Sequence, residues 1–174
     1  MPKIIENLKE RLIEEAKAQL ARDGYSAMTI RSVAKACGVG VGTVYNYFPS
    51  KEALLASYML TDWNTCIDAI STVSQGANTP EPVVRCIYEQ LQQFSQRHQA
   101  IFQDATAASA FAGSFSRYHA VLRSQLAAPL RKFCERDFSA DFISESLLTW
   151  TMAGKDFQEI YGIIGKLFLA SENL

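Results

Sequence analysis

The side chains best suited to chemistry gather in one stretch, residues 29–51. There Thr43, Asn46 and Tyr47 follow a glycine-rich turn, and their hydroxyl and amide groups are of the kind that hydrogen-bond base edges and phosphate oxygens. The chain holds no nucleophile elbow, no phosphate-binding glycine loop, no zinc-ligand spacing and no prominent histidine–carboxylate pair. We therefore predict a binding protein with no catalytic residues, metal or cofactor, and an enzyme is the weaker alternative.

The elements that must position these side chains are two short helices that cross at a steep angle, a helix-turn-helix. Ala34 is small enough to lie where the helices cross, and Gly38 can take the positive φ that the turn requires. Val44 and Phe48 can plug the junction from the second helix. If they face inward, helical spacing turns a groove-facing set outward, namely Gly42, Thr43, Asn46 and Tyr47. A helical hairpin without this function would match only part of the pattern.

The run GVGVGTVYNYFPSKEALL, residues 38–55, resembles the signature of the TetR family of regulators. The matching positions are Gly38, Val39, Gly42, Thr43, Val44, Tyr45, Tyr47, Phe48, Lys51 and Leu54. The resemblance implies an all-α fold, with an N-terminal three-helix helix-turn-helix DNA-binding domain in residues 1–50. A C-terminal helical bundle for ligand binding and dimerisation would fill residues 51–174. One departure is Gly40, where the family usually has serine, so a side-chain phosphate contact would be missing there.

The resemblance also implies a set of DNA contacts, made by Thr29, Arg31, Gly42, Thr43, Tyr45, Asn46, Tyr47 and Lys51. Asn46 is the best candidate for reading a base, adenine in particular. Thr29 and Lys51 begin helices, where N–H groups and the helix dipole favour a phosphate. Tyr45 is explained equally well as a packing residue, and Arg31 and Lys35 as solvated surface charges.

Apolar residues recur every three or four positions, which predicts helices throughout the chain. The expected helices span roughly residues 3–22, 30–37, 41–47, 51–74, 81–97, 100–108, 115–136, 140–152 and 155–170. Gly113 is expected to separate two of them, and Pro129 to kink the helix 115–136. Residues 75–80 form the clearest loop.

The last two expected helices carry more apolar surface than a small body easily buries, which indicates a dimer interface. One short recognition helix reads only a few base pairs, so useful affinity requires a homodimer on near-palindromic double-stranded DNA. The interface candidates are Phe142, Leu147, Phe157, Tyr161, Ile164 and Phe168. Ordinary core packing is the alternative explanation for this stripe.

The C-terminal part is rich in aromatic residues, some of which could line an apolar cavity for a small-molecule effector. The candidates are Trp63, Phe94, Phe102, Phe111, Phe115, Tyr118 and Trp150, with core packing as the alternative for each. By the resemblance, an apolar or amphipathic effector would relieve repression by tilting the helix 51–74 as a lever. Activation instead of repression, a reduced or absent pocket, and a helical adaptor that binds protein remain alternatives.

Charge and composition fit this interpretation without deciding it. The net charge is −1, but residues 1–55 hold eight Lys/Arg and six Asp/Glu (+2), whereas the remainder holds nine and twelve (−3). No apolar run reaches the roughly 18 residues of a membrane span, and residues 1–20 do not form a signal peptide, so we expect a cytoplasmic protein. The cysteines, at positions 37, 66, 86 and 134, lack metal-site spacing and are expected to be buried, with redox sensing as the alternative.

Overall fold

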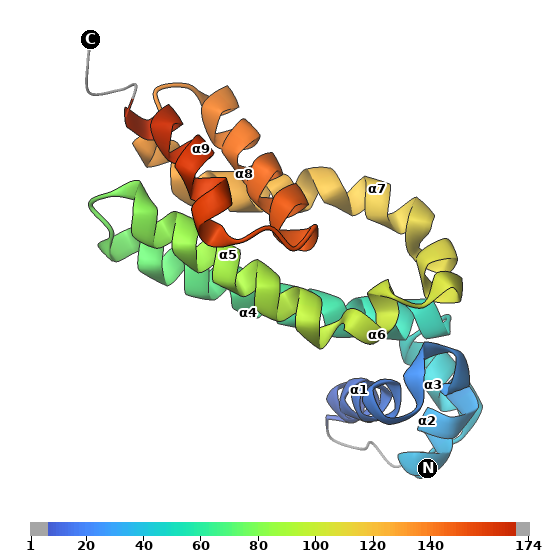
Figure 1. Ribbon diagram of the computed structural model, residues 1–174. Helices are drawn as coiled ribbons and strands as arrows, with labels where there is room; N and C mark the ends of the chain where they lie inside the picture. Colours follow the sequence, from blue (N-terminus) through green and yellow to red (C-terminus); the bar gives the residue numbers. More distant parts are fainter. Residues whose placement is uncertain (1–6, 170–174) are drawn as a thin grey trace. The chain divides into compact units, whose positions relative to one another are not determined.

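The computed structural model describes residues 7–169, apart from the side chains of residues 112–118 and 169. Within this part the chain forms helices and turns without strands, which confirms the predicted fold class. The elements are α1 (Leu8–Ala27), α2 (Ile30–Ala36), α3 (Val41–Tyr47), α4 (Lys51–Gly76), α5 (Pro80–Arg97), α6 (Gln99–Phe102), α7 (Ala105–Ala127), the 3₁₀ helix η1 (Ala128–Phe133), α8 (Asp137–Met152) and α9 (Phe157–Leu169) (Figure 1). Over the described residues, every helix is too short or too polar to cross a membrane.

The helices form two compact units, and the chain passes between them more than once. Of the described residues, unit 1 holds 7–62 and 98–112, and unit 2 holds 63–97 and 113–169. α4 and α7 therefore each begin in unit 1 and continue into unit 2. The predicted domain boundary after residue 50 does not coincide with a boundary between these packing units, and the functional division that it implies stays a prediction.

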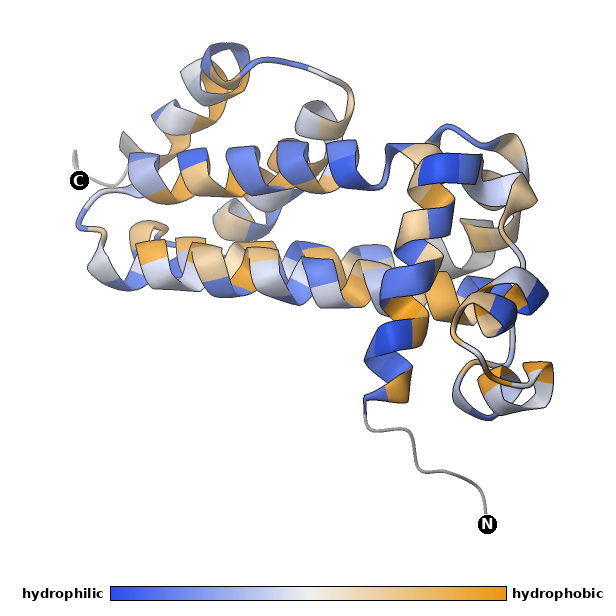
Figure 2. Ribbon diagram, turned by 90° about the horizontal axis from the view of Figure 1, so that it is seen from below, coloured by the Kyte–Doolittle hydropathy of each residue, from blue (hydrophilic) through white to orange (hydrophobic). Residues whose placement is uncertain are grey.

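α1 is an amphipathic helix that carries one buried stripe into the core of unit 1. Its residues Leu8, Leu12, Ala16 and Leu20 follow one another at a spacing of four and are buried, because that spacing keeps them on one face. Figure 2 shows the alternation of hydrophobic and hydrophilic residues along this helix, which follows the grey N-terminal trace. Gly24 interrupts the helical path with φ +80°, and a further turn leads to Ala27.

The core of unit 1 joins α1, α2, α3 and the start of α4 to residues from much later in the chain. Val33 of α2, Val44 of α3 and Leu54 of α4 are inaccessible to solvent. Ile101 of α6 and Ala107 of α7 belong to the same buried cluster. Unit 1 is therefore larger than the three-helix domain that the sequence suggests.

Unit 2 packs α5 against α8, α9 and η1. α5 buries one continuous face formed by Val83, Val84, Ile87, Tyr88, Leu91 and Phe94, and its other face is polar. On the opposing helix Ile143 and Leu147 are fully buried, and Leu130 of η1 closes the same core. The core of unit 2 thus buries much of the apolar surface for which the sequence predicts a dimer interface or an effector cavity.

The predicted helices are confirmed for 41–47 and nearly so for 51–74 and 81–97, but the prediction for residues 100–136 is wrong. α7 runs through Gly113 without interruption, because one glycine inside a helix costs only about 1 kcal/mol. Pro129 does not kink a long α-helix; the α-helix ends at Ala127 and a 3₁₀ helix follows. Proline lacks the N–H that an α-helical turn would use, so a change of helix type is the physical result.

Candidate nucleic-acid interface

α2 begins with a capping box that also ties it to α1. Thr29 Oγ1 accepts a hydrogen bond from the Ser32 amide at 3.0 Å, and Ser32 Oγ accepts one from the Thr29 amide at 3.1 Å. The Ser32 hydroxyl lies 2.5 Å from Oε1 of Gln19, which is buried on α1. The predicted cap at Thr29 is confirmed, and these contacts set the position of α2 on α1.

The turn between α2 and α3 has the geometry that the glycine predicts. Gly38 adopts φ +70°, a conformation that other residues rarely take, and the Val39 amide donates to the Ala34 carbonyl at 3.0 Å. Arg11 of α1 donates to the Cys37 carbonyl at 3.2 Å, while the Cys37 thiol lies 3.7 Å from the Arg11 carbonyl. Burial raises the pKa of the Cys37 thiol, which disfavours its reactive thiolate form. The role of Arg11 leaves no signal in the sequence, because no local pattern links residues 26 positions apart.

α3 presents the residues that its spacing predicts. Val44 is inaccessible and Phe48, which ends the helix, is 2% exposed, so both plug the junction. Gly42 and Asn46 are exposed, Thr43 is half-buried, and Tyr45 and Tyr47 are 52% and 46% exposed. The inward and outward faces of α3 are therefore confirmed, and the high exposure of Tyr45 argues against a packing role.

Gly40 supplies the start of α3 without a side chain. It is the N-cap residue, and α3 receives no side-chain hydrogen bond there. A Cβ atom built on Gly40 would meet only Thr43 Oγ1, at 3.8 Å, so there is room for the serine that the family usually has. The departure thus removes a hydroxyl without changing the local packing.

Lys51 starts α4 as expected, but its side chain turns into unit 1. Its ammonium donates to the Tyr25 carbonyl and lies 3.8 Å from the centre of the Tyr25 ring. The Tyr25 hydroxyl in turn donates to Glu52 Oε1 at 2.9 Å. Burial lowers the pKa of Lys51 and, with the hydrogen bond to Glu52, raises the pKa of Tyr25 to about 12. A phosphate contact by Lys51 stays a prediction, and the structure adds an internal contact that the sequence did not suggest.

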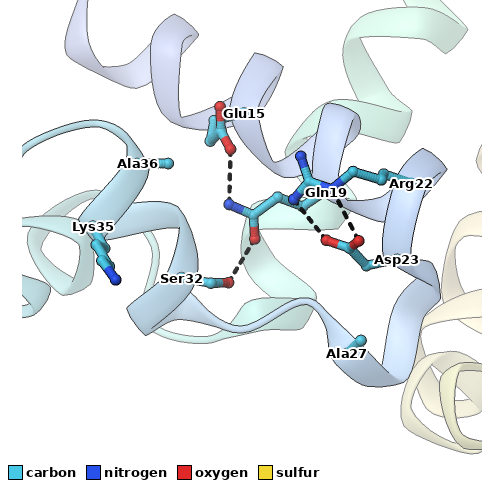
Figure 3. A pocket seen from close by; sticks show the side chains of 8 residues that line it. All are labelled: Glu15, Gln19, Arg22, Asp23, Ala27, Ser32, Lys35 and Ala36. Atoms are coloured by element: carbon cyan, nitrogen blue, oxygen red, sulfur yellow. Dashed lines mark hydrogen bonds and ion pairs between the residues drawn. The ribbon is translucent and has the colours of Figure 1, made fainter.

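The other predicted cations remain available at the surface, since Arg31 and Lys35 are both exposed on α2. Lys35 stands at the edge of a depression of about 410 Å³ between α1 and α2, which Figure 3 shows from close by. Within it Gln19 Nε2 donates to Glu15 at 2.8 Å, and Arg22 pairs with Asp23 at 2.7 Å. Because four of the lining groups pair with one another, few free polar groups converge on the depression, unlike in a typical ligand site.

The predicted effector residues are divided between the two compact units. Trp63 and Phe94 are buried edge to face in unit 2, 5.5 Å apart, and Trp63 Nε1 donates to Gln125 Oε1 at 2.7 Å. Phe102 and Phe111 are half-buried members of unit 1, and Trp150 is 50% exposed on α8. The side chains of Phe115 and Tyr118 lie outside the described residues. A cavity lined by the whole set stays a prediction. The exposed side chain of Trp150 does not support its place in such a cavity.

Four of the predicted dimer residues require correction. Leu147, Phe157, Ile164 and Phe168 are buried inside the protomer, so they have almost no surface left to offer a partner. Tyr161 is half-buried, and its ring stacks on that of Phe157 at 5.2 Å. Of the predicted interface residues, Phe142 is the one that is clearly exposed, at 50%. The helical stripe was correctly recognised as apolar, but most of it faces the core of unit 2.

A different apolar set on the same two helices is exposed. On α8 the exposed apolar side chains are Phe138 at 75%, Phe142 at 50%, Trp150 at 50% and Met152 at 37%. Phe138 and Phe142 lie one turn apart on the same side of the helix. On α9 Ile163 and Leu167, also four apart, are exposed. Phe138 and Ile163 were not predicted from the sequence, although their spacing of four from Phe142 and Leu167 is a usable signal.

Comparison with known proteins supports the interpretation of the N-terminal part. Residues 12–58 match the family model described as bacterial regulatory proteins, tetR family. The HTH-type transcriptional repressor KstR of Rhodococcus jostii (strain RHA1) is 33% identical over 104 residues, which covers 60% of this chain and 48% of KstR. The chain thus spans about half the length of this curated relative.

Solved structures share the fold at low identity. The transcriptional regulator SCO7518 from Streptomyces coelicolor A3(2) superposes with a TM-score of 0.69 at 15% identity, covering 92% of this chain and 97% of that one. FadR from Thermus thermophilus, a TetR family transcriptional repressor solved in complex with lauroyl-CoA, gives a TM-score of 0.62 at 22% identity and covers 95% of each chain. Residues 12–58 therefore resemble the DNA-binding part of the TetR family, and the solved structures show that the chain as a whole shares their fold.

Proposed function

We propose that the chain is a ligand-responsive transcriptional regulator that binds a near-palindromic DNA operator as a homodimer. The observation that carries this proposal is the outward face of α3, where Gly42, Thr43, Asn46 and Tyr47 point away from the plug formed by Val44 and Phe48. A short helix with this division fits the major groove, where amide and hydroxyl groups read base edges.

Within this interface the residues have different tasks. Asn46 reads a base, because an exposed amide can both donate to and accept from adenine. Tyr45, Tyr47 and Thr43 contribute hydroxyls to bases or phosphates, and the exposed Arg31 and Lys35 contact the backbone. Thr29 and Lys51 act mainly by holding α2 and the end of α1 in place, given their internal hydrogen bonds.

The homodimer uses the exposed side of α8 and α9 rather than the buried stripe. Leaving Phe138, Phe142, Trp150, Ile163 and Leu167 in water is costly for a monomer, and a second copy could bury them. Phe138 and Phe142 form a tilted ring pair 6.5 Å apart, which suits them to the centre of such a contact.

The effector is a small apolar or amphipathic molecule that binds the helical body and releases the operator. This part of the proposal draws support from the aromatic content of the body and from FadR, whose solved structure contains lauroyl-CoA. α4 is the element able to transmit the change, since it continues from unit 1 into unit 2. The coupling required is modest, about 1–3 kcal/mol.

The test begins with selection of binding sequences from random duplex DNA by the full-length chain. We expect enrichment of a near-palindrome, bound by a dimer with strong salt dependence. Failure to enrich any sequence would refute the operator-binding proposal. Equal operator affinity with and without fatty acids, acyl-CoA esters and hydrophobic drugs would refute the effector part alone.

A further inference from the structure

We infer that the DNA-binding unit includes residues 98–112, and that Asp104 in this segment is a positioning residue for the recognition helix. The inference rests on the proposed function, because it concerns how that helix is held for DNA. The family match ends at residue 58, whereas unit 1 continues with residues 98–112. The segment comprises α6 and the first turns of α7.

The apolar part of the segment is built into the core of unit 1. Ile101 and Ala107 are buried in the same cluster as Leu12 of α1 and Leu55 of α4, and Phe111 packs against it. α6 packs directly on α1. Residues this well buried stabilise the unit that holds α3, so the segment is part of its core rather than a loop lying over it.

Asp104 connects the segment to the residues between α1 and α2. Its Oδ1 accepts hydrogen bonds from the amides of Thr106 at 2.8 Å and Ala107 at 3.0 Å, which caps α7. Its Oδ2 accepts the Ser26 hydroxyl at 3.1 Å. These hydrogen bonds, above all that from Ala107, hold the pKa of Asp104 below its usual value, so the carboxylate stays charged. One carboxylate thus starts α7 and holds Ser26.

Ser26 lies in the short connector, residues 24–29, through which α1 passes to α2. Tyr25 in the same connector meets the edge of the Phe111 ring at 6.4 Å and also contacts Lys51 and Glu52. The connector is therefore held by α4 and by the start of α7. Because Thr29 at its end caps α2, and α2 packs on α3, a shift of the connector changes the direction in which α3 is presented.

The experiment is a double-mutant cycle in the full-length chain, read out as affinity for the selected operator and for a scrambled duplex. Ser26→Ala removes the hydroxyl but leaves the α7 cap intact, and Asp104→Ala removes both. We expect Ser26→Ala to weaken operator binding about fivefold, the effect of losing one solvent-exposed hydrogen bond, with affinity for the scrambled duplex and the salt slope unchanged. In the Asp104→Ala background the same substitution should have no further effect.

Rescue and control variants separate positioning from other roles. Ser26→Thr keeps the hydroxyl and should restore operator affinity, and Thr106→Ala, an exposed neighbour whose amide remains, should behave as the unchanged chain does. If Asp104→Ala does not fold, Asp104→Ser completes the cycle, because its single hydroxyl can still cap α7 but leaves no second oxygen for Ser26. An equal loss of operator affinity from Ser26→Ala in both backgrounds would show that Ser26 contacts DNA directly. No loss of affinity would show that the Ser26–Asp104 hydrogen bond does not affect DNA binding. Either result overturns the inference. If the unchanged chain selects no operator, the proposed function fails instead.

Discussion

α3 in unit 1 and α8 in unit 2 both expose aromatic side chains, but the two surfaces differ in what they can bind. Tyr45 and Tyr47 on α3 end in hydroxyls and stand beside Asn46, so their partner must be polar. Phe138 and Phe142 on α8 carry no polar atom in their side chains, so only an apolar surface repays their burial. Exposure alone therefore does not define a functional surface, whereas the exposed atoms identify the class of partner.

A charge placed on the apolar surface of α8 should have the strongest effect on DNA binding. Phe142→Glu should dissociate the dimer, because a carboxylate would be buried without a partner, and should weaken operator binding by about 100-fold or more. Sedimentation velocity and operator titration measure the two effects. Gln158→Glu, an exposed site on α9 four or more residues from Ile163 and Leu167, is the matched control. A variant that remains dimeric would place the interface elsewhere.

The next effect tests the polar surface. Asn46→Ala should cost about 1–3 kcal/mol in operator affinity and relax the sequence preference at one base position. Selection from random DNA with the variant measures this directly. A uniform loss across all sequences would mean that Asn46 contacts the backbone instead of a base.

A pair of cations in unit 1 sharpens the distinction between surface and interior. Lys51→Met should lower the free energy of unfolding by about 1–2 kcal/mol, since it removes a contact to a ring and a carbonyl, and should leave the salt slope unchanged. Arg31→Met should leave stability unchanged and lower the slope by about one. Urea unfolding and salt-dependent binding distinguish them. If Lys51→Met lowers the salt slope of DNA binding as Arg31→Met does, Lys51 contacts the DNA backbone and is not an internal residue.

The smallest effect concerns the buried tyrosine of unit 1. The pKa of Tyr25 rises to about 12 in the folded chain, against about 10 when unfolded, so the neutral phenol stabilises the fold. That contribution is complete below pH ~10 and is lost as pH rises through about 12. Unfolding measured at intervals across this range should show a steeper alkaline loss than in Tyr25→Phe, which keeps Lys51. Parallel curves for the two proteins would contradict the assignment.

The sequence predicted the helix-turn-helix well because its constraints are local. Gly38, Val44 and Phe48 lie within eleven residues, and each has one role that its type and spacing define. Asp104 was also within reach of a local argument, since an aspartate two and three residues before the amides it caps is a common helix start.

The C-terminal helices were harder because one periodic pattern serves two purposes. An apolar residue every three or four positions is required both for a core face and for an interface, so Leu147 and Phe142 look alike in sequence. Only the packing of α5 against α8 shows that the first is buried and the second is not. Likewise, the return of residues 98–112 to unit 1 depends on contacts about 80 residues apart, such as Ser26 with Asp104.

The path of the chain has a practical consequence for engineering. Because it crosses between the units at residues 62–63, 97–98 and 112–113, the DNA-reading part cannot be exchanged as a simple N-terminal cassette. A chimera joined at residue 50 would pair a foreign head with Ile101, Ala107 and Asp104 of this chain, leaving holes or clashes where they dock. A functional chimera should therefore exchange two segments together, the N-terminal part of unit 1 and residues 98–112.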